Sequence, residues 1–199
     1  MQQGQHSVYL TEGSEARRLF EDSRDRIYQY RAEPFLLSSG KQSNHYFNAR
    51  KITMVPDLLY RLACVLRDEV LPRIGYPDGP PAVGGLTLGS DPIAFGVSLA
   101  YQQRGKTVYP IVVRKAPKDH GQGRQIEGEA EQVREVLLVD DVVTTGGASL
   151  KAIAALRAAG LIVRTAVCVV DREEGGFEAL RAEGVHLHGL FKKGDFPRS

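Results

Sequence analysis

The segment best suited to chemistry begins with two adjacent aspartates, Asp140 and Asp141, directly after the apolar run 136–139. The residues that follow them are Val142, Val143, Thr144, Thr145, Gly146, Gly147, Ala148 and Ser149. Glycines let backbone N–H groups approach an anion, and the amino end of a following helix adds partial positive charge. We expect the hydroxyls of this loop, including that of Ser149, to donate to the same anion. Because a phosphate repels carboxylates, the aspartates suit a vicinal diol or a cation, and a ribose 5-phosphate carries both a phosphate and a diol.

Two widespread phosphate-binding motifs do not fit this segment. A Walker loop needs a lysine directly after its glycines, and a dinucleotide-binding loop needs Gly-x-Gly-x-x-Gly after a first strand. The alternative that stays open is a solvated turn in which the two aspartates have no ligand. The succession of apolar strand, carboxylates, hydroxyls and glycines favours the ligand site.

A second glycine loop follows the apolar residues 82–83. Its glycines are Gly84, Gly85 and Gly89. Ser90 or Asp91 is then suited to capping a helix. Alone, these glycines indicate no more than a turn. Because parallel strands end at one edge of a sheet, the two loops together predict a second anion site beside the first.

A third segment, residues 114–124, combines cationic side chains with glycines. Its cationic or potentially cationic residues are Arg114, Lys115, Lys118, His120 and Arg124, and its glycines are Gly121 and Gly123. Without a large apolar side chain it cannot anchor to a core, so we expect a mobile loop. The functional interpretation is a lid that closes over a highly charged leaving group. The alternative is a solvated surface loop.

The size and composition of the chain narrow the class of protein. Its 199 residues suit one domain, and a formal net charge of +2 does not suggest a nucleic-acid-binding surface. No apolar run approaches the roughly 18 residues of a membrane span, and residues 1–5 lack the features of a signal peptide. Cys64 and Cys168 lie among apolar residues and are expected to be reduced thiols. We therefore expect a cytoplasmic protein.

Apolar periodicity predicts the elements of the amino-terminal part. A helix is expected over 15–31, and Pro34, which comes shortly after it, is expected to stop it. Two short strands, around 35–37 and 46–47, are joined by a turn at 38–41. A second helix is expected over 56–70, opened by Pro56.

From residue 82 onward, apolar strands alternate with helices. The expected strands lie at 82–83, 108–113, 136–139, 161–170 and 185–187, and the expected helices at 92–103 and 148–159. Strands buried on both faces read as continuous apolar runs of this kind. The pattern predicts an α/β fold with a doubly wound, mostly parallel sheet. We expect one domain over 1–199, in which residues 15–55 form an N-terminal hood.

Together the three segments resemble the type I phosphoribosyltransferases, which use 5-phosphoribosyl 1-diphosphate (PRPP). The stretch 139–147, Val-Asp-Asp-Val-Val-Thr-Thr-Gly-Gly, is similar to the PRPP signature of that family. Three further stretches resemble the orotate phosphoribosyltransferases: 35–47 resembles their hood, 114–121 their catalytic loop, and Asp171-Arg172 their Asp-Arg pair. The resemblance extends over about residues 15 to 195.

This resemblance implies roles for individual residues. Lys118 and His120 become loop residues that reach the site of a neighbouring subunit, and with Asp140 and Asp141 they form the catalytic set. The PRPP-binding set is Arg114, Lys115, Lys118, His120, Asp140, Asp141, Val142, Val143, Thr144, Thr145, Gly146, Gly147 and Ala148. The orotate-binding set is Thr144, Arg172, Tyr46 and Phe47. In that set the planar guanidinium of Arg172 suits a carboxylate.

The chain departs from some members of the family at two positions. It has Ser38 and Leu88 where some members have lysines. We expect Arg114, Lys115 or the partner subunit's Lys118 to supply the missing charge.

The implied reaction is a Mg²⁺-dependent displacement of diphosphate from PRPP by orotate, giving orotidine 5′-monophosphate for UMP biosynthesis. Mg²⁺ would be held mainly by the diphosphate, the ribose hydroxyls and water, with no direct protein ligand assigned. The resemblance also implies a homodimer with shared active sites, without nucleic-acid or membrane partners. Two alternatives stay open: a non-catalytic PRPP-binding regulator, and a phosphoribosyltransferase for another base.

Overall fold

A twisted six-stranded sheet forms the centre of the molecule. The computed structural model describes residues 7–36, 42–117 and 125–197, and within them the strands follow the order β5-β4-β3-β6-β7-β8. The strands are β3 (Ala82–Leu86), β4 (Tyr109–Val113), β5 (Ile126–Glu127), β6 (Leu137–Val143), β7 (Thr165–Asp171) and β8 (His186–Lys192). Neighbouring strands from β4 to β8 pair in parallel, and β5 pairs antiparallel with β4.

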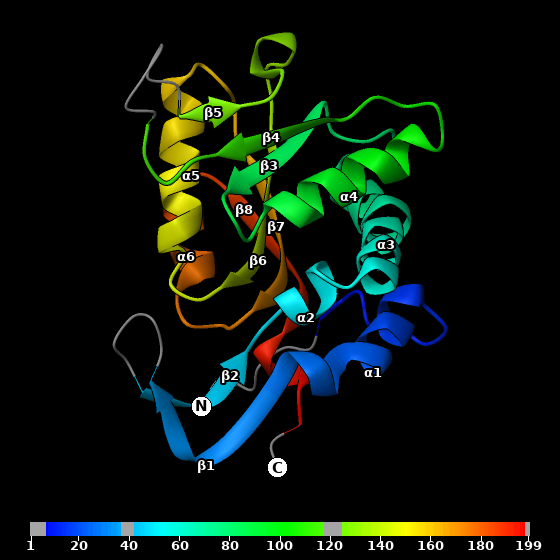
Figure 1. Ribbon diagram of the computed structural model, residues 1–199, viewed down its shortest axis with the longest axis vertical. Helices are drawn as coiled ribbons and strands as arrows, with labels where there is room; N and C mark the ends of the chain where they lie inside the picture. The colour runs from blue at the N-terminus through cyan, green and yellow to red at the C-terminus, as the bar shows by residue number, and fades with distance from the viewer. Residues whose placement is uncertain (1–6, 37–41, 118–124, 198–199) are drawn as a thin grey trace.

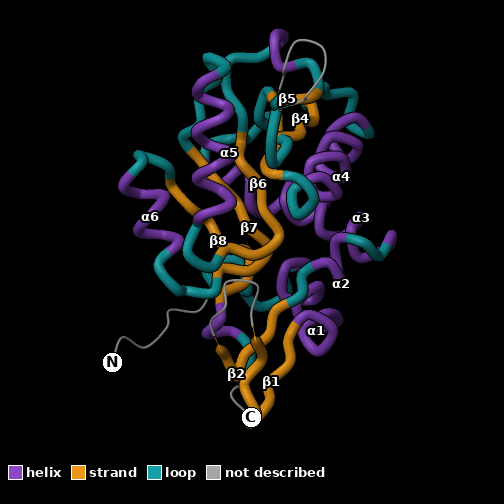
Figure 2. Tube along the Cα trace, turned by 60° about the vertical axis from the view of Figure 1, so that its left-hand side comes forward, coloured by secondary structure: helices purple, strands orange, loops and turns teal. Residues whose placement is uncertain are grey.

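Helices cover both faces of this sheet (Figures 1 and 2). On one side lie α3 (Pro56–Val65) and α4 (Asp91–Gln102), and on the other lie α5 (Gly147–Ala158) and α6 (Gly176–Ala182). Side chains of β6 alternate between the two faces, where Val139 belongs to one apolar cluster and Leu138 to the cluster on the opposite face. Successive strand residues point to opposite faces, so each face packs against its own helices. The predicted doubly wound, mostly parallel α/β fold is confirmed.

The chain reverses its direction of travel across the sheet between β3 and β6. From β3 it continues to β4 on one side, whereas from β6 it continues to β7 and β8 on the other, and β3 and β6 are hydrogen-bonded neighbours. Ligands of open α/β sheets bind at the carboxyl ends of such strands. Thr144 to Gly146 directly follow β6, and the loop that carries Gly89 directly follows β3, whereas Gly84 and Gly85, expected in that loop, lie within β3.

An amino-terminal unit packs beside the carboxyl edge of the sheet (Figure 1). It consists of α1 (Glu15–Ile27), β1 (Tyr28–Leu36), β2 (Gln42–Phe47) and α2 (Arg50–Thr53). The predicted helix over 15–31 is wrong at its end, since the chain turns extended at Tyr28. Tyr28 and Tyr30 pair with Phe47 and His45 on β2, and this cross-strand pairing outweighs the helical propensity.

Other boundaries also differ from the expectation. The strand expected at 136–139 continues to Val143, because β7 offers a pairing partner as far as Asp171, so both aspartates lie within the strand. The helix expected over 56–70 ends at Val65 and continues as a π-helical turn, Leu66–Val70. That turn directs the Glu69 carboxylate at the first N–H groups of α1 (2.8 and 3.2 Å to Glu15 N and Ala16 N).

The short elements β5 and α6 were not expected, because two and seven residues carry too little periodicity to be recognised. The strand expected over 161–170 begins only at Thr165. The boundaries of the longer elements β4, α4 and α5 agree with the expectation to within a residue or so.

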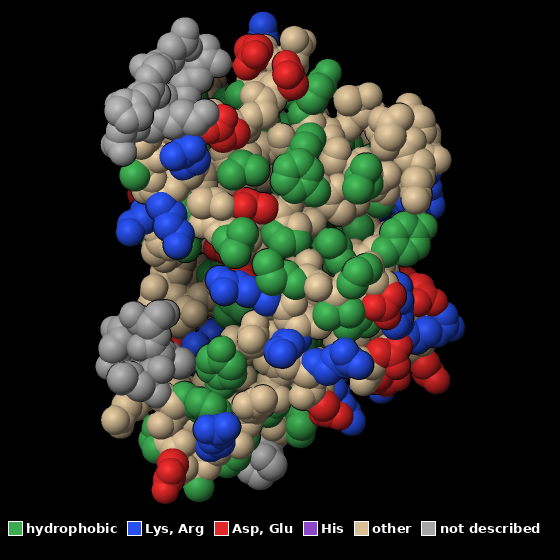
Figure 3. All heavy atoms as spheres, viewed as in Figure 1, with side chains coloured by type: hydrophobic (Ala, Val, Ile, Leu, Met, Phe, Trp, Pro, Cys, Tyr) green, Lys and Arg blue, Asp and Glu red, His purple; other side chains and the backbone are tan. Residues whose placement is uncertain are grey.

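The surface carries exposed hydrophobic side chains around α3 and α4. Tyr60 lies on α3, Phe95 and Leu99 lie one turn apart on α4, and Leu88 lies in the loop after β3. Figure 3 shows hydrophobic side chains gathered over these elements.

Among the described helices, none has the length and apolar character that crossing a membrane requires. Both cysteines are free thiols, with Cys168 buried as expected and Cys64 only partly buried.

Candidate active site

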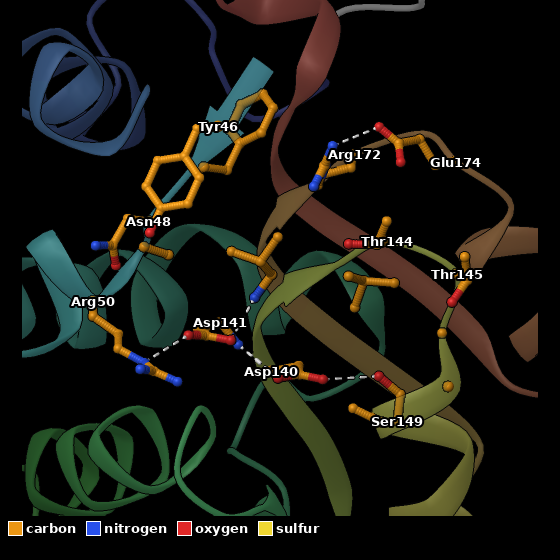
Figure 4. A pocket seen from close by; sticks show the side chains of 17 residues that line it. Tyr46, Asn48, Arg50, Asp140, Asp141, Thr144, Thr145, Ser149, Arg172 and Glu174 are labelled. Carbon is orange, nitrogen blue, oxygen red and sulfur yellow. Dashed lines mark hydrogen bonds and ion pairs between the residues drawn. The ribbon is translucent and has the colours of Figure 1, made fainter. Parts of the chain in front are cut away.

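A cavity of about 680 Å³ opens at the carboxyl edge of the sheet, between the β6–α5 loop and the hood (Figure 4). The residues that line it are Tyr46, Phe47, Asn48, Ala49, Arg50, Asp140, Asp141, Val142, Val143, Thr144, Thr145, Gly146, Gly147, Ala148, Ser149, Arg172 and Glu174. The cavity therefore brings together the residues assigned from sequence on β2, on the β6–α5 segment and after β7.

Asp140 is a buried carboxylate at the floor of this cavity. Its residue is 8% exposed, and its Oδ1 accepts a hydrogen bond from the Asp141 N–H at 3.0 Å. Its Oδ2 accepts from Ser149 Oγ, also at 3.0 Å. Burial, and secondly the negative charge of Asp141, raise the pKa of Asp140 well above its ordinary range. Ser149 was expected to donate to a bound phosphate, but its hydroxyl is buried and donates to the Asp140 carboxylate instead.

Asp141 is more open and lies between two other parts of the site. Its Oδ1 accepts from the Val142 N–H at 2.8 Å, and its Oδ2 lies 3.7 Å from Arg50 Nε. The second glycine loop passes directly beside it, since a Cβ on Gly89 would lie 2.6 Å from Asp141 Oδ1. A side chain at that position would therefore require the Asp141 carboxylate to move. Gly89 thus lies at the same edge of the sheet as the first glycine loop, as expected, whereas the second anion site stays a prediction.

The loop between β6 and α5 has the geometry of an anion site. Gly146 has φ 82° and directly precedes α5, so its N–H and those of the first helical turn are free of helical partners. The Thr144 carbonyl accepts from the Gly176 N–H at 3.0 Å, and thus α6 holds the loop in place. The partial positive charge of the α5 amino end adds to these donors.

Arg172 follows β7 and is buried between the core and the hood. It is 5% exposed, so its side chain does not lie on the surface. Its Nη2 donates to Glu174 Oε1 at 2.9 Å and lies 3.5 Å from Ser43 Oγ on β2. Its guanidinium lies over the Phe47 ring at 5.5 Å, and its buried Nε has no hydrogen-bond partner among the described residues. A buried unpaired guanidinium donor is costly, so a ligand acceptor at this point would relieve it.

The two hood aromatics differ in their burial. Tyr46 is 37% exposed and stacks on Phe35 with ring centroids 5.2 Å apart. Phe47 is buried and packs against Phe196 and Tyr28. Adjacent strand residues point to opposite sides, so only Tyr46 offers an open ring face, while Phe47 supports Arg172.

The cationic segment begins at a clamped hairpin base. The Arg114 N–H donates to the Gln125 carbonyl at 2.8 Å, and Gln125 Nε2 donates to the Arg114 carbonyl at 2.9 Å. Arg114 also pairs with Glu127 at 3.4 Å. Arg114 and the exposed Lys115 do not line the cavity, so the structure does not bring these two to the other predicted residues. Lys118 and His120 lie outside the described residues.

Some lining residues were not assigned from sequence. Asn48, Ala49, Arg50 and Glu174 line the cavity without having been predicted to do so. Glu174 stands two residues after Arg172, and this spacing is a signal that points to it. A single arginine such as Arg50 at the start of a short helix carries no signal of its own. In the described part of the chain, no group of three or more histidine, cysteine or acidic side chains could hold a metal.

Comparison with known proteins gives the family. No protein-family model matches the chain. The orotate phosphoribosyltransferase of Leptospira biflexa is 47% identical over 178 residues, which are 89% of this chain and 95% of that protein. Crystal structures of Mycobacterium tuberculosis orotate phosphoribosyltransferase with Fe(III) dicitrate and with PRPP match with TM-scores of 0.73 and 0.69, at 31% and 30% identity, each covering 91% of this chain and 98% of the other. With its site and its relatives in agreement, the chain belongs to the orotate phosphoribosyltransferase family.

Proposed function

We propose that this protein transfers the phosphoribosyl group of PRPP to orotate, in a Mg²⁺-dependent reaction that yields orotidine 5′-monophosphate and diphosphate for pyrimidine biosynthesis. One observation carries the proposal. A single cavity joins an aspartate pair, a glycine loop at a helix amino end, and a buried arginine with an unpaired donor. These three features suit the diol, the 5-phosphate and the carboxylate of the two substrates. Family membership is consistent with the same reaction.

The phosphoribosyl group is oriented by the β6–α5 segment. Backbone N–H groups of Gly146, Gly147 and Ala148 and the side chains of Thr144 and Thr145 are donors for the 5-phosphate. Asp140 and Asp141 accept hydrogen bonds from the ribose hydroxyls. Because Asp140 is held by two internal hydrogen bonds, it mainly fixes the position of this pair.

Orotate binds on the hood side of the cavity. The open face of Tyr46 stacks on the pyrimidine, and Thr144 contacts its polar edge. The orotate carboxylate pairs with Arg172, whose Nε is otherwise unsatisfied. A ring nitrogen of orotate is then directed at C1 of the ribose. Holding both substrates in this geometry supplies much of the catalysis.

The transition state resembles an oxocarbenium ion, with negative charge growing on the leaving diphosphate. Cations are therefore needed at that group, and Arg114, Lys115 and the partner subunit's Lys118 and His120 are proposed for it. Closure of their loop would also exclude water, which otherwise hydrolyses PRPP.

Mg²⁺, when bound, neutralises charge on the diphosphate. The residues present fit an ion carried by the substrate, since Asp140 and Asp141 are adjacent, Glu174 is bonded to Arg172, and the described residues contain no group of three or more side chains that could hold a metal. Asp141 is the carboxylate with more open oxygens, because both Asp140 oxygens accept protein hydrogen bonds.

The working unit is proposed to be a homodimer, located in the cytoplasm and without nucleic-acid or membrane partners. The exposed hydrophobic side chains of Tyr60, Phe95 and Leu99 on two neighbouring helices support an interface with a second copy (Figure 3). Mixing inactive Lys118→Ala and Asp141→Asn subunits tests the shared site. Random exchange should restore up to about a quarter of wild-type activity, because half the dimers are mixed and each has one intact site. If the subunits exchange and no activity returns, the loop serves its own chain.

The reaction itself is tested by following the ultraviolet absorbance of orotate with PRPP and Mg²⁺. We expect orotate to be consumed, and uracil, adenine and hypoxanthine to be left unchanged. Turnover of another base would point to a different phosphoribosyltransferase. PRPP binding without turnover of any base, together with a salt-dependent shift of nucleic acid, would point to a regulator.

A further inference from the structure

Arg50 projects into the cavity from the hood, on the side away from the β6–α5 loop (Figure 4). It opens α2, and its Nε lies 3.7 Å from Asp141 Oδ2. Its side chain is 55% exposed, so it is not part of the core. Asp141 is its ion-pair partner among the described residues, which leaves the terminal guanidinium nitrogens available to a ligand.

Arg50 matters because few positively charged side chains line the cavity among the described residues. Among the described lining residues, the cations are Arg50 and Arg172. Arg172 is committed to Glu174 and lies over the Phe47 ring, on the side of the hood aromatics. Arg50 is therefore the cation that faces the remaining side of the aspartate pair. The substrate PRPP carries a diphosphate that needs such a charge.

The positions of the substituents on the ribose ring indicate which group of PRPP lies near Arg50. The diol occupies C2 and C3, the 5-phosphate extends from the C4 end, and the diphosphate leaves from C1 at the opposite end. With the 5-phosphate at Gly146 and the diol at Asp141, the diphosphate points away from the anion loop. Figure 4 shows Arg50 there, with Asp141 between Arg50 and Thr144. The loop carrying Gly89 borders the same place.

The Gly89 loop cannot itself supply the charge. A Cβ on Gly89 would lie 2.6 Å from Asp141 Oδ1, so the loop backbone approaches this carboxylate closely. The residue before it is Leu88, which is exposed and uncharged. A cation for this side of the cavity must come from another element, and α2 provides one.

We infer that Arg50 binds the diphosphate of PRPP, and that Asp141 holds its guanidinium ready in the free protein. This inference rests on the proposed function. When the ribose hydroxyls engage Asp141, Arg50 turns its fork to the diphosphate oxygens. Its contact with the leaving group makes it a residue of the binding machinery that compensates for the absence of a cation at Leu88.

The test compares two ligands that differ only in the diphosphate. Affinities for PRPP with Mg²⁺ and for ribose 5-phosphate are measured by calorimetry on the full-length protein and on Arg50→Gln. We expect PRPP to bind about ten- to a hundredfold more weakly, as for the loss of one charge-assisted contact, and ribose 5-phosphate to keep its affinity. Arg50→Lys should recover part of the PRPP affinity. Lys51→Ala, which removes the neighbouring exposed cation of α2, is the matched control and should change neither affinity.

The outcomes separate the possible errors. Equal weakening of both ligands, with an unchanged unfolding temperature, would mean that Arg50 only supports Asp141. Unchanged PRPP affinity in Arg50→Gln would mean that it does not contact the diphosphate. Either result overturns the inference and leaves the proposed function intact, whereas wild-type protein that binds no PRPP overturns both.

Discussion

The two sides of the cavity are built differently. On the core side, Asp140 and Ser149 are buried and bonded to each other, and the loop at Gly146 is held by α6. On the hood side, Tyr46 is 37% exposed and the Arg50 side chain 55% exposed. Backbone and buried contacts fix the first side, whereas side chains on a two-stranded sheet and a four-residue helix form the second.

This difference matches the parts of the two substrates. Phosphate and ribose are common to all reactions of PRPP, and a preorganised core surface suits them. The base and the departing diphosphate change during the reaction, and the more exposed hood side suits them. Arg172 joins the two sides, since it follows a core strand yet contacts Ser43 and Phe47 of the hood.

The largest expected effect comes from breaking the core side. Asp141→Asn keeps the size of the side chain but removes the negative charge of the carboxylate that accepts hydrogen bonds from the ribose hydroxyls. We expect kcat/KM to fall about a hundredfold, with folding retained, from the loss of one or two charge-assisted hydrogen bonds. Steady-state kinetics measure this, and Asp25→Asn on the exposed face of α1 is the control. Unchanged turnover would remove Asp141 from the site.

Replacing Arg172, which joins the two sides of the cavity, should weaken the binding of one substrate more than that of the other. Arg172→Ala should weaken orotate binding by about 1.5–3 kcal/mol. It should leave PRPP binding nearly unchanged, because the arginine lies on the side of the cavity proposed for the base. Calorimetry with each substrate separates the two affinities. Arg164→Ala, which removes an exposed arginine paired with Glu135, is the matched control. An equal loss for PRPP would show that Arg172 supports the whole cavity instead of recognising the carboxylate.

The buried carboxylate of the core side predicts a pH dependence. The pKa of Asp140 is raised above its ordinary value of 3.8, so the folded state holds this proton more tightly than the unfolded state. Asp140 therefore stabilises the folded state at pH values below its ordinary pKa. This stabilisation is lost as the pH rises through the raised pKa. Asp140→Asn should flatten this loss in denaturant titrations of the ligand-free protein at several pH values. An identical pH profile in the variant would contradict it.

The smallest effect is expected from loosening the hood. Glu69 accepts hydrogen bonds from the first N–H groups of α1, so Glu69→Ala should cost about 1 kcal/mol, as for the loss of a helix cap. Hydrogen exchange in α1 should accelerate while exchange in β6 stays unchanged. The exposed Glu12→Ala is the control. Equal acceleration in both elements would mean that the hood and the core unfold as one unit.

The sequence alone was enough to predict the fold class and the core side of the site. Alternation of apolar strands with helices determines a doubly wound sheet, and the carboxyl ends of its strands lie at one edge. The segment from Asp140 to Ala148 is continuous, so its chemistry is readable from neighbouring residues. Arg172 was assigned through the resemblance of Asp171-Arg172, at the end of an expected strand, to the Asp-Arg pair of the orotate phosphoribosyltransferases.

Tertiary structure decided the rest. Arg50 meets Asp141, and Ser43 meets Arg172, only because the hood packs beside the sheet, and residues so far apart in sequence share no periodic signal. Ser149 turned out to be a support for Asp140, since a hydroxyl can bond to a phosphate or a carboxylate and only packing selects its partner. Helix α1 ended at Ile27 because β2 offered Tyr28 a strand partner. Local order thus predicts what adjacent residues do together, whereas contacts between distant segments depend on the packing free energy of the whole chain.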